Sequence, residues 1–122
     1  MIWVVTDHRE TREALVPLIE KLSYEVGVID CSDEVAKRIV FQSPALIIID
    51  CGIDGGFELI SKVRSHRKPK MAPIVMFSHD EQNLREKSLL LGADAYVPKG
   101  SLDWAELMEE VRRFAGPPPK RD

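Results

Sequence analysis

Short apolar runs recur along the chain and alternate with stretches whose apolar residues follow a helical spacing. The runs are Ile2–Val5, Tyr24–Ile29, Ala45–Ile49, Ile74–Phe77 and Ala95–Val97. Three of them are rich in Ile and Val and apolar at every position, which is typical of parallel strands covered by helices on both faces. The pattern therefore predicts five strands of one parallel sheet.

The stretches between these runs show the periodicity of amphipathic helices. In the first, Ala14, Leu15, Leu18 and Leu22 form one apolar face. Pro17 lies beyond the first turn of this helix and is expected to bend it. Further helices are predicted over about 33–42, 57–65 and 82–91, the last ending at Gly92, and a fifth from Ser101 onward.

Five strands alternating with five helices predict an α/β fold, (βα)5. Because crossovers between parallel strands are right-handed, the sheet should be doubly wound. A chain of 122 residues is long enough for one domain, expected over 1–115. The segment 116–122 contains three consecutive prolines that cannot continue a helix, and it is predicted to be a proline-rich tail or linker stub.

Composition narrows the class of protein. The 17 Lys and Arg stand against 20 Asp and Glu, a net charge of −3, which argues against direct binding of nucleic acid. No apolar run approaches the ~18 residues of a membrane span, and no basic leader precedes the first apolar run. Cys31 and Cys51 fit neither a disulfide framework nor a metal-binding spacing. We therefore expect a cytoplasmic protein with reduced cysteines.

Chemically capable side chains directly follow the predicted strands. In such sheets ligands bind outside the carboxyl ends of the strands. Asp7 and Asp50 would repel each other there unless a cation such as Mg²⁺ lay between them. Ser78 and Lys99 add a hydroxyl and a positive charge, which suit a phosphoryl group. Since a carboxylate can attack phosphorus, the residues are compatible with an aspartyl-phosphate site.

Each of these residues also has an ordinary structural interpretation. Asp7 could cap the first helix, Asp50 could end its strand, and Lys99 could be a solvated surface residue. Ser78 could begin a turn. Their coincidence at neighbouring strand ends favours the phosphoryl site.

Four stretches carry a resemblance to a known family: Val4-Val5-Thr6-Asp7-His8, Leu46–Asp50, Pro73–Ser78 and Gly92–Lys99. In their order and spacing the chain resembles the receiver domain of two-component response regulators, from Met1 to about Phe114. The resemblance implies a flavodoxin-like sheet in the strand order 2-1-3-4-5. It also implies a signalling domain that assists its own phosphorylation and dephosphorylation, and not an enzyme acting on an external metabolite.

Matched position by position, the resemblance implies roles for individual residues. Asp50 would be the phosphoacceptor for a sensor histidine kinase, and Asp7, Asp50 and the carbonyl of Gly52 would hold Mg²⁺. Ser78 and Lys99 would bind the phosphoryl group. Ser78 and Tyr96 would form the switch that alters a face for a downstream output protein or domain, although Tyr96 equally suits an ordinary strand aromatic.

The chain also departs from the family's usual pattern. Thr6 replaces one of two adjacent acids, the loop 51–56 is shorter than usual, and His79 stands beside the expected phosphoryl pocket. These departures leave open a degenerate receiver that acts as a phosphorylation-independent interaction module. A flavodoxin-like ligand-binding domain or enzyme fragment is a third alternative, weakened by the absence of a Gly-rich phosphate loop from the sequence.

The implied strand order bears on the two cysteines. Cys31 and Cys51 would follow strands that are separated by the first strand, about 10 Å apart. That distance is too large for a disulfide without loop movement.

Three consecutive leucines, Leu89–Leu91, lie in the predicted fourth helix. Because successive helical residues turn by ~100°, they cannot all face the core, and Leu90 is expected to point outward. We hypothesise that Leu90 belongs to an interaction patch on the face of the fourth helix, fifth strand and fifth helix, where receivers often form homodimers.

Overall fold

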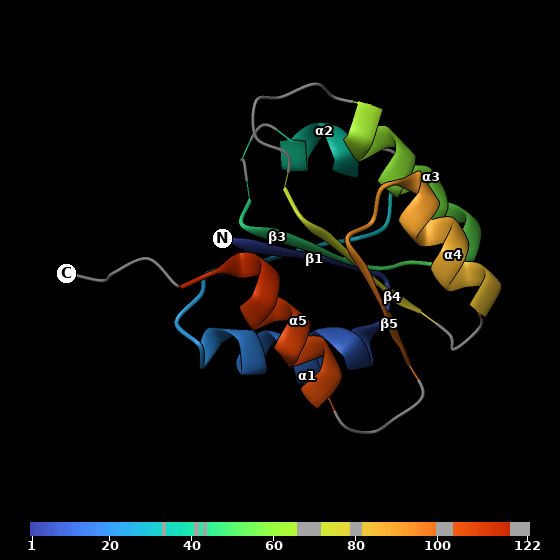
Figure 1. Ribbon diagram of the computed structural model, residues 1–122. Coiled ribbons are helices and arrows are strands. Elements are labelled where there is room, and N and C mark those ends of the chain that lie inside the picture. The colour runs from blue at the N-terminus through green and yellow to red at the C-terminus, as the bar shows by residue number, and fades with distance from the viewer. Residues whose placement is uncertain are drawn as a thin grey trace.

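All strands run in the same direction, and the chain returns between consecutive strands through a helix (Figure 1). The protein is represented by a computed structural model that describes residues 1–32, 34–40, 42, 44–65, 72–78, 82–99 and 104–117. Within these residues, five strands form one sheet in the order β2-β1-β3-β4-β5. The strands are β1 (Ile2–Thr6), β2 (Val26–Ile29), β3 (Leu46–Asp50), β4 (Ile74–Ser78) and β5 (Ala95–Pro98). The predicted fold class and strand order are confirmed.

The helices follow the predicted pattern with shifted ends. They are α1 (Arg9–Glu20), α2 (Val35–Val40), α3 (Ile53–Ser65), α4 (Gln82–Leu91) and α5 (Ala105–Ala115). Pro17 lies inside α1, which nevertheless continues to Glu20. The prediction for α4 is confirmed, and Gly92 follows it with a φ of 118° that favours glycine. The predicted start at Ser101 lies outside the described residues.

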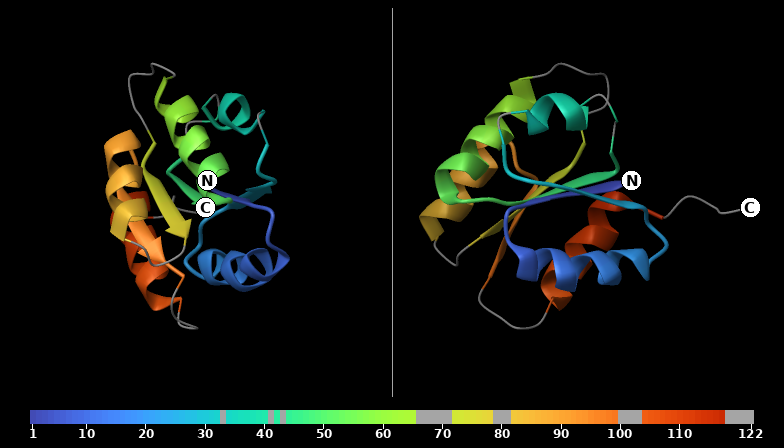
Figure 2. Two further views of the ribbon diagram at one scale, coloured as in Figure 1. Left: turned by 90° about the vertical axis from the view of Figure 1, so that its right-hand side faces the viewer. Right: turned by 180° about the vertical axis from the view of Figure 1, so that it is seen from behind.

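Side chains of the central strands alternate between two cores. In β3, Ile47 and Ile49 join the apolar cluster beneath α2 and α3, whereas Leu46 and Ile48 join the cluster beneath α1 and α5. Figure 2 shows the corresponding layers, with α1 and α5 on one face of the sheet and α2, α3 and α4 on the other. Every residue of β1, β3 and β4 is buried. The uninterrupted apolar runs are thus explained by helices on both faces.

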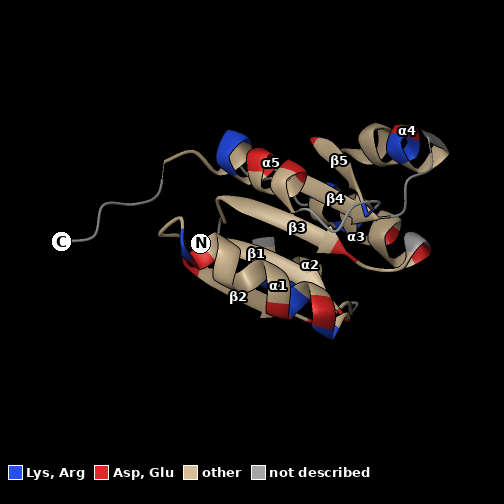
Figure 3. Cartoon of the chain, turned by 90° about the horizontal axis from the view of Figure 1, so that it is seen from below, with Lys and Arg blue, Asp and Glu red and all other residues tan. Residues whose placement is uncertain are grey.

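Charged residues are concentrated on the helices and at the ends of strands (Figure 3). Across the described strands the single charged residue is Asp50, the last residue of β3. Its side chain is 1% exposed. A buried carboxylate is costly without partners, so its surroundings identify the candidate site. None of the described helices has the length and apolar character needed to cross a membrane.

Candidate functional site

The Asp50 carboxylate is held at both of its oxygen atoms. The hydroxyl of Thr6 donates a hydrogen bond of 2.9 Å to Oδ2, and the Lys99 ammonium forms an ion pair with Oδ1. Thr6 and Asp50 are opposite each other in the register of β1 and β3, which is why they meet. Lys99 neutralises the buried charge, and Thr6 sets the orientation of the carboxylate.

Thr6 makes a second contact that completes its hydrogen bonding. Its fully buried hydroxyl accepts a hydrogen bond of 2.9 Å from the backbone N–H of His8. Thr6 was predicted only as the replacement of an acid and not as a partner of Asp50. The sequence did contain a signal for this contact, because Thr6 and Asp50 are the last residues of two strands that are neighbours in the implied strand order.

Asp7 and Gly52 lie at exposed positions at the same edge of the sheet. The Asp7 carboxylate accepts a hydrogen bond of 2.9 Å from the backbone N–H of Cys31. The Gly52 carbonyl accepts one of 2.7 Å from the N–H of Gly56, which lies in the first turn of α3. Together with Asp50, these residues offer only oxygen donors.

That donor chemistry fits Mg²⁺, which favours carboxylate and carbonyl oxygens and retains several water ligands. A Cβ placed on Gly52 would meet nothing within 4 Å, so this side of the loop is open. Among the described residues, no group of three or more His, Cys, Asp or Glu side chains could hold a metal ion. A magnesium site here would therefore rest on two carboxylates, one carbonyl and water.

Ser78 and Tyr96 are buried in the neighbouring strands, at 4% and 3% exposure. The Ser78 carbonyl accepts a hydrogen bond of 2.6 Å from the backbone N–H of Lys99. Tyr96 packs in the cluster beneath α3, with the guanidinium carbon of Arg85 5.6 Å from its ring centroid. Ser78 is thus linked through the backbone to the lysine that pairs with Asp50.

A cavity of about 580 Å³ opens beside Lys99 and is lined by Asp7, His8, Phe77 and Trp104, among others. The Lys99 ammonium lies 5.3 Å from the centroid of the Phe77 ring, and the rings of Phe77 and Trp104 are 5.5 Å apart. These two aromatic residues were not predicted to be part of the site. A small anion entering this cavity would meet the Lys99 ammonium. His79, which was expected beside the phosphoryl pocket, lies outside the described residues.

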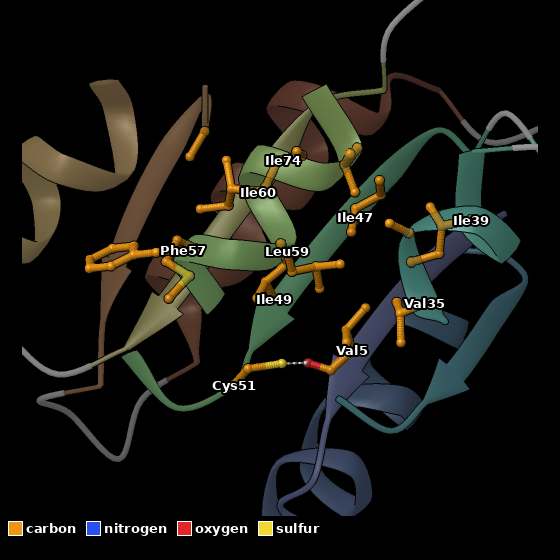
Figure 4. Close-up of a cluster of buried hydrophobic side chains, with 14 of the residues drawn as sticks. Val5, Val35, Ile39, Ile47, Ile49, Cys51, Phe57, Leu59, Ile60 and Ile74 are labelled. Carbon is orange, nitrogen blue, oxygen red and sulfur yellow. Dashed lines mark hydrogen bonds between the residues drawn. The ribbon is translucent and has the colours of Figure 1, made fainter. Parts of the chain in front are cut away.

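Cys31 and Cys51 are joined by a disulfide, so the expectation of separate, reduced cysteines is wrong for this structure. Their Cα atoms are 6.0 Å apart. The spacing of strands applies to paired residues, and β2 pairs with β1 only as far as Ile29. Beyond that point the chain turns across the end of β1. Figure 4 shows the Cys51 sulfur directed at the carbonyl oxygen of Val5, 3.9 Å away.

The chain is similar in sequence to known regulatory proteins. The transcriptional regulatory protein GltR of Pseudomonas aeruginosa is 30% identical over 102 residues, which are 80% of this chain and 42% of GltR. CreB of Escherichia coli, also a transcriptional regulatory protein, is 25% identical over 126 residues, covering 97% of this chain and 55% of CreB. The chain therefore spans about half the length of these curated relatives.

Solved structures show the same fold. The receiver domain of NtrX from Brucella abortus superposes with a TM-score of 0.78 at 21% identity, covering 94% of this chain and 98% of that one. The receiver domain of the sensor histidine kinase PA1611 from P. aeruginosa, crystallised with Mg²⁺ in its active-site cleft, gives a TM-score of 0.76 at 21% identity, covering 94% and 96%. The family model of the response regulator receiver domain matches residues 2–112. With its strand order and this match over most of its length, the chain belongs to the response regulator receiver domain family.

Proposed function

We propose that Asp50 accepts a phosphoryl group from a sensor histidine kinase. The observation that carries this proposal is the buried Asp50 carboxylate, held between Thr6 and Lys99 at the carboxyl edge of the sheet. An Asp50 oxygen attacks phosphorus, and the bond between phosphorus and the donor's histidine nitrogen breaks. The nitrogen keeps the electron pair, while Asp50 becomes an acyl phosphate. The Lys99 ammonium stabilises the negative charge of the phosphoryl oxygens.

The proposed metal ligands are Asp7, Asp50 and the carbonyl of Gly52. Bound Mg²⁺ would neutralise charge on the phosphoryl oxygens. Support comes from the purely oxygen donor set and from the Mg²⁺ in the PA1611 receiver domain. Asp7 would have to present an oxygen to the ion in addition to, or in place of, its bond from Cys31. Thr6 supplies no second acid, so we expect weaker Mg²⁺ binding than in receivers with paired acids.

The proposed switch connects the phosphoryl group to a partner-binding surface. Phosphorylation adds about −1.5 to −2 of charge, which would attract the hydroxyl of Ser78. Ser78 is already bonded through its carbonyl to the Lys99 backbone, so the two would move together and allow Tyr96 to repack. The change is a shift between conformations that exist before phosphorylation.

The proposed partner-binding surface includes two of the leucines of α4, Leu89 and Leu90. Leu90 is 87% exposed, as predicted, and Leu89 is 43% exposed. Two adjacent exposed apolar side chains on one helix suit a protein contact. We propose that this surface meets a second copy of the chain or a downstream output protein or domain. We place the protein in the cytoplasm, where a histidine kinase could reach it.

Intact-mass analysis after incubation with Mg²⁺ and acetyl phosphate tests the proposed function. We expect a Mg²⁺-dependent phosphoryl adduct on the wild type and none on Asp50→Asn. If the wild type gains no adduct and also fails to bind beryllofluoride, the proposal is wrong. The chain would then be an interaction module that works without phosphorylation.

A further inference from the structure

The disulfide joins two loops that both contact the candidate phosphorylation site. Cys51 directly follows Asp50 and packs in the cluster beneath α2 and α3. The backbone N–H of Cys31 donates to the Asp7 carboxylate. We propose that Cys31 and Cys51 form a reversible thiol–disulfide pair whose oxidation restrains the residues that bind Mg²⁺ and the phosphoryl group.

The surroundings of both sulfur atoms accommodate the reduced state as well. The Cys31 sulfur lies 3.8 Å from the carbonyl oxygen of Asp50, and the Cys51 sulfur lies 3.9 Å from that of Val5. A disulfide sulfur has no proton to donate. On reduction the two sulfur atoms move apart to a non-bonded distance, and each thiol can then donate a weak S–H···O hydrogen bond to the neighbouring carbonyl. Reduction therefore leaves no buried sulfur group without a partner, which is the requirement for a pair that can change state in the folded protein.

A reagent can reach the pair from one side. Cys31 is only partly buried, while Cys51 is 6% exposed. Both border a cavity of about 90 Å³ whose lining includes the ion-paired side chains of Glu58 and Lys62. Cys31 is thus the sulfur open to attack, and Cys51 is the resolving partner.

Oxidation requires a disulfide oxidant such as oxidised glutathione. The Cys31 thiolate attacks one sulfur of the oxidant and releases one thiol. The Cys51 thiolate then attacks Cys31 in the mixed disulfide and releases the second thiol. Two electrons pass from the cysteines to the oxidant, and the two protons leave with the released thiols. Disulfides in a reducing cytoplasm are usually transient or redox-sensing, which agrees with a reversible pair.

The effect on phosphorylation rests on the proposed function of Asp50. In the oxidised chain the cross-link holds Cys31, and therefore its N–H, against Asp7. It also tethers the residue next to Asp50 and so limits movement of the Gly52 carbonyl. Both restraints oppose movement of Asp7 and of the Gly52 carbonyl toward a bound ion. The oxidised protein should therefore bind Mg²⁺ and accept phosphoryl groups less readily than the reduced protein.

The first experiment tests the pair without reference to phosphorylation. The chain is equilibrated in buffers with an increasing ratio of oxidised to reduced glutathione. Free thiols are then alkylated, and the adducts are counted by intact-mass analysis. For the wild type we expect a reversible change from two alkyl adducts in reducing buffer to none in oxidising buffer. Cys31→Ser and Cys51→Ser should each carry one adduct in reducing buffer. Hydrogen exchange should show a more slowly exchanging Cys31 amide in the oxidised state. Two adducts in every buffer, or equal exchange in the two states, would overturn the proposal.

The second experiment measures acetyl phosphate-driven phosphorylation of oxidised and reduced protein at limiting Mg²⁺. We expect the oxidised wild type to react at least about fivefold more slowly. Cys31→Ser, which keeps its backbone N–H, should react equally fast in both buffers. Equal rates for oxidised and reduced wild type would refute the coupling. If neither form is phosphorylated, the proposed function of Asp50 fails, and the thiol titration and hydrogen exchange still decide the redox pair.

Discussion

Thr6→Val removes one hydroxyl from the site while preserving the shape of the side chain. Thr6 is fully buried and donates to the Asp50 carboxylate at 2.9 Å. A hydrogen bond to a charged group contributes about 1.5–3 kcal/mol. The N–H of His8 also loses its acceptor, at about 1 kcal/mol, and the added methyl group offsets about 0.8 kcal/mol. We expect the free energy of unfolding to fall by about 2–3 kcal/mol.

Urea denaturation with linear extrapolation measures this change. The midpoint should fall by about 1–2 M for a domain of this size. Thr11→Val is the matched control, because Thr11 is 5% exposed and its hydroxyl has no hydrogen bond to another described residue. It should change stability by less than about 0.5 kcal/mol.

A double-mutant cycle with Asp50→Asn isolates the interaction itself. The loss caused by Thr6→Val should shrink to about 1 kcal/mol when residue 50 carries no charge. Equal losses for the Thr6 and Thr11 variants, or an undiminished loss in the Asp50→Asn background, would refute the claim that Thr6 holds the carboxylate.

Two further substitutions test the surface and the core. Leu90→Glu should abolish self-association of the beryllofluoride-treated protein in analytical ultracentrifugation, whereas Asn83→Glu on the same helix should not. Unchanged association of the Leu90 variant would exclude an interaction patch at Leu90. Gly27→Ala should lower the free energy of unfolding by about 1–3 kcal/mol, because its Cβ would lie 2.7 Å from the Trp3 ring. Gly55→Ala, in α3 with nothing within 4 Å of its Cβ, should instead raise stability by about 0.5–1 kcal/mol, and losses of similar size for both would contradict the contact.

The local pattern of residues was sufficient to predict the layers of the fold. An apolar run such as Leu46–Ile49 can be accommodated only where helices cover both faces of a strand, and all four of its residues are buried. The outward position of Leu90 followed from helical geometry in the same way. Helix ends were predicted less well, since α2 is limited to Val35–Val40 and α3 begins at Ile53. Burial against other elements decides those ends, and no local signal reports it.

The candidate site, too, could be predicted from the sequence only in part. Strand ends in the sequence identified Asp50 and Lys99, which the fold brings into an ion pair. The roles of Asp7, Gly52 and Tyr96 stay predictions.

Contacts between residues far apart in the chain were decided only by tertiary structure. Thr6 lies 44 positions from Asp50, and Cys31 lies 20 positions from Cys51. Strand spacing predicted the cysteines to be too far apart, because it describes paired strands and not the loops that converge beyond them. The sequence by itself therefore determined which side chains reach the carboxyl edge of the sheet. The paths of the loops across the end of β1 decided which of them touch, since those paths depend on packing against the whole sheet.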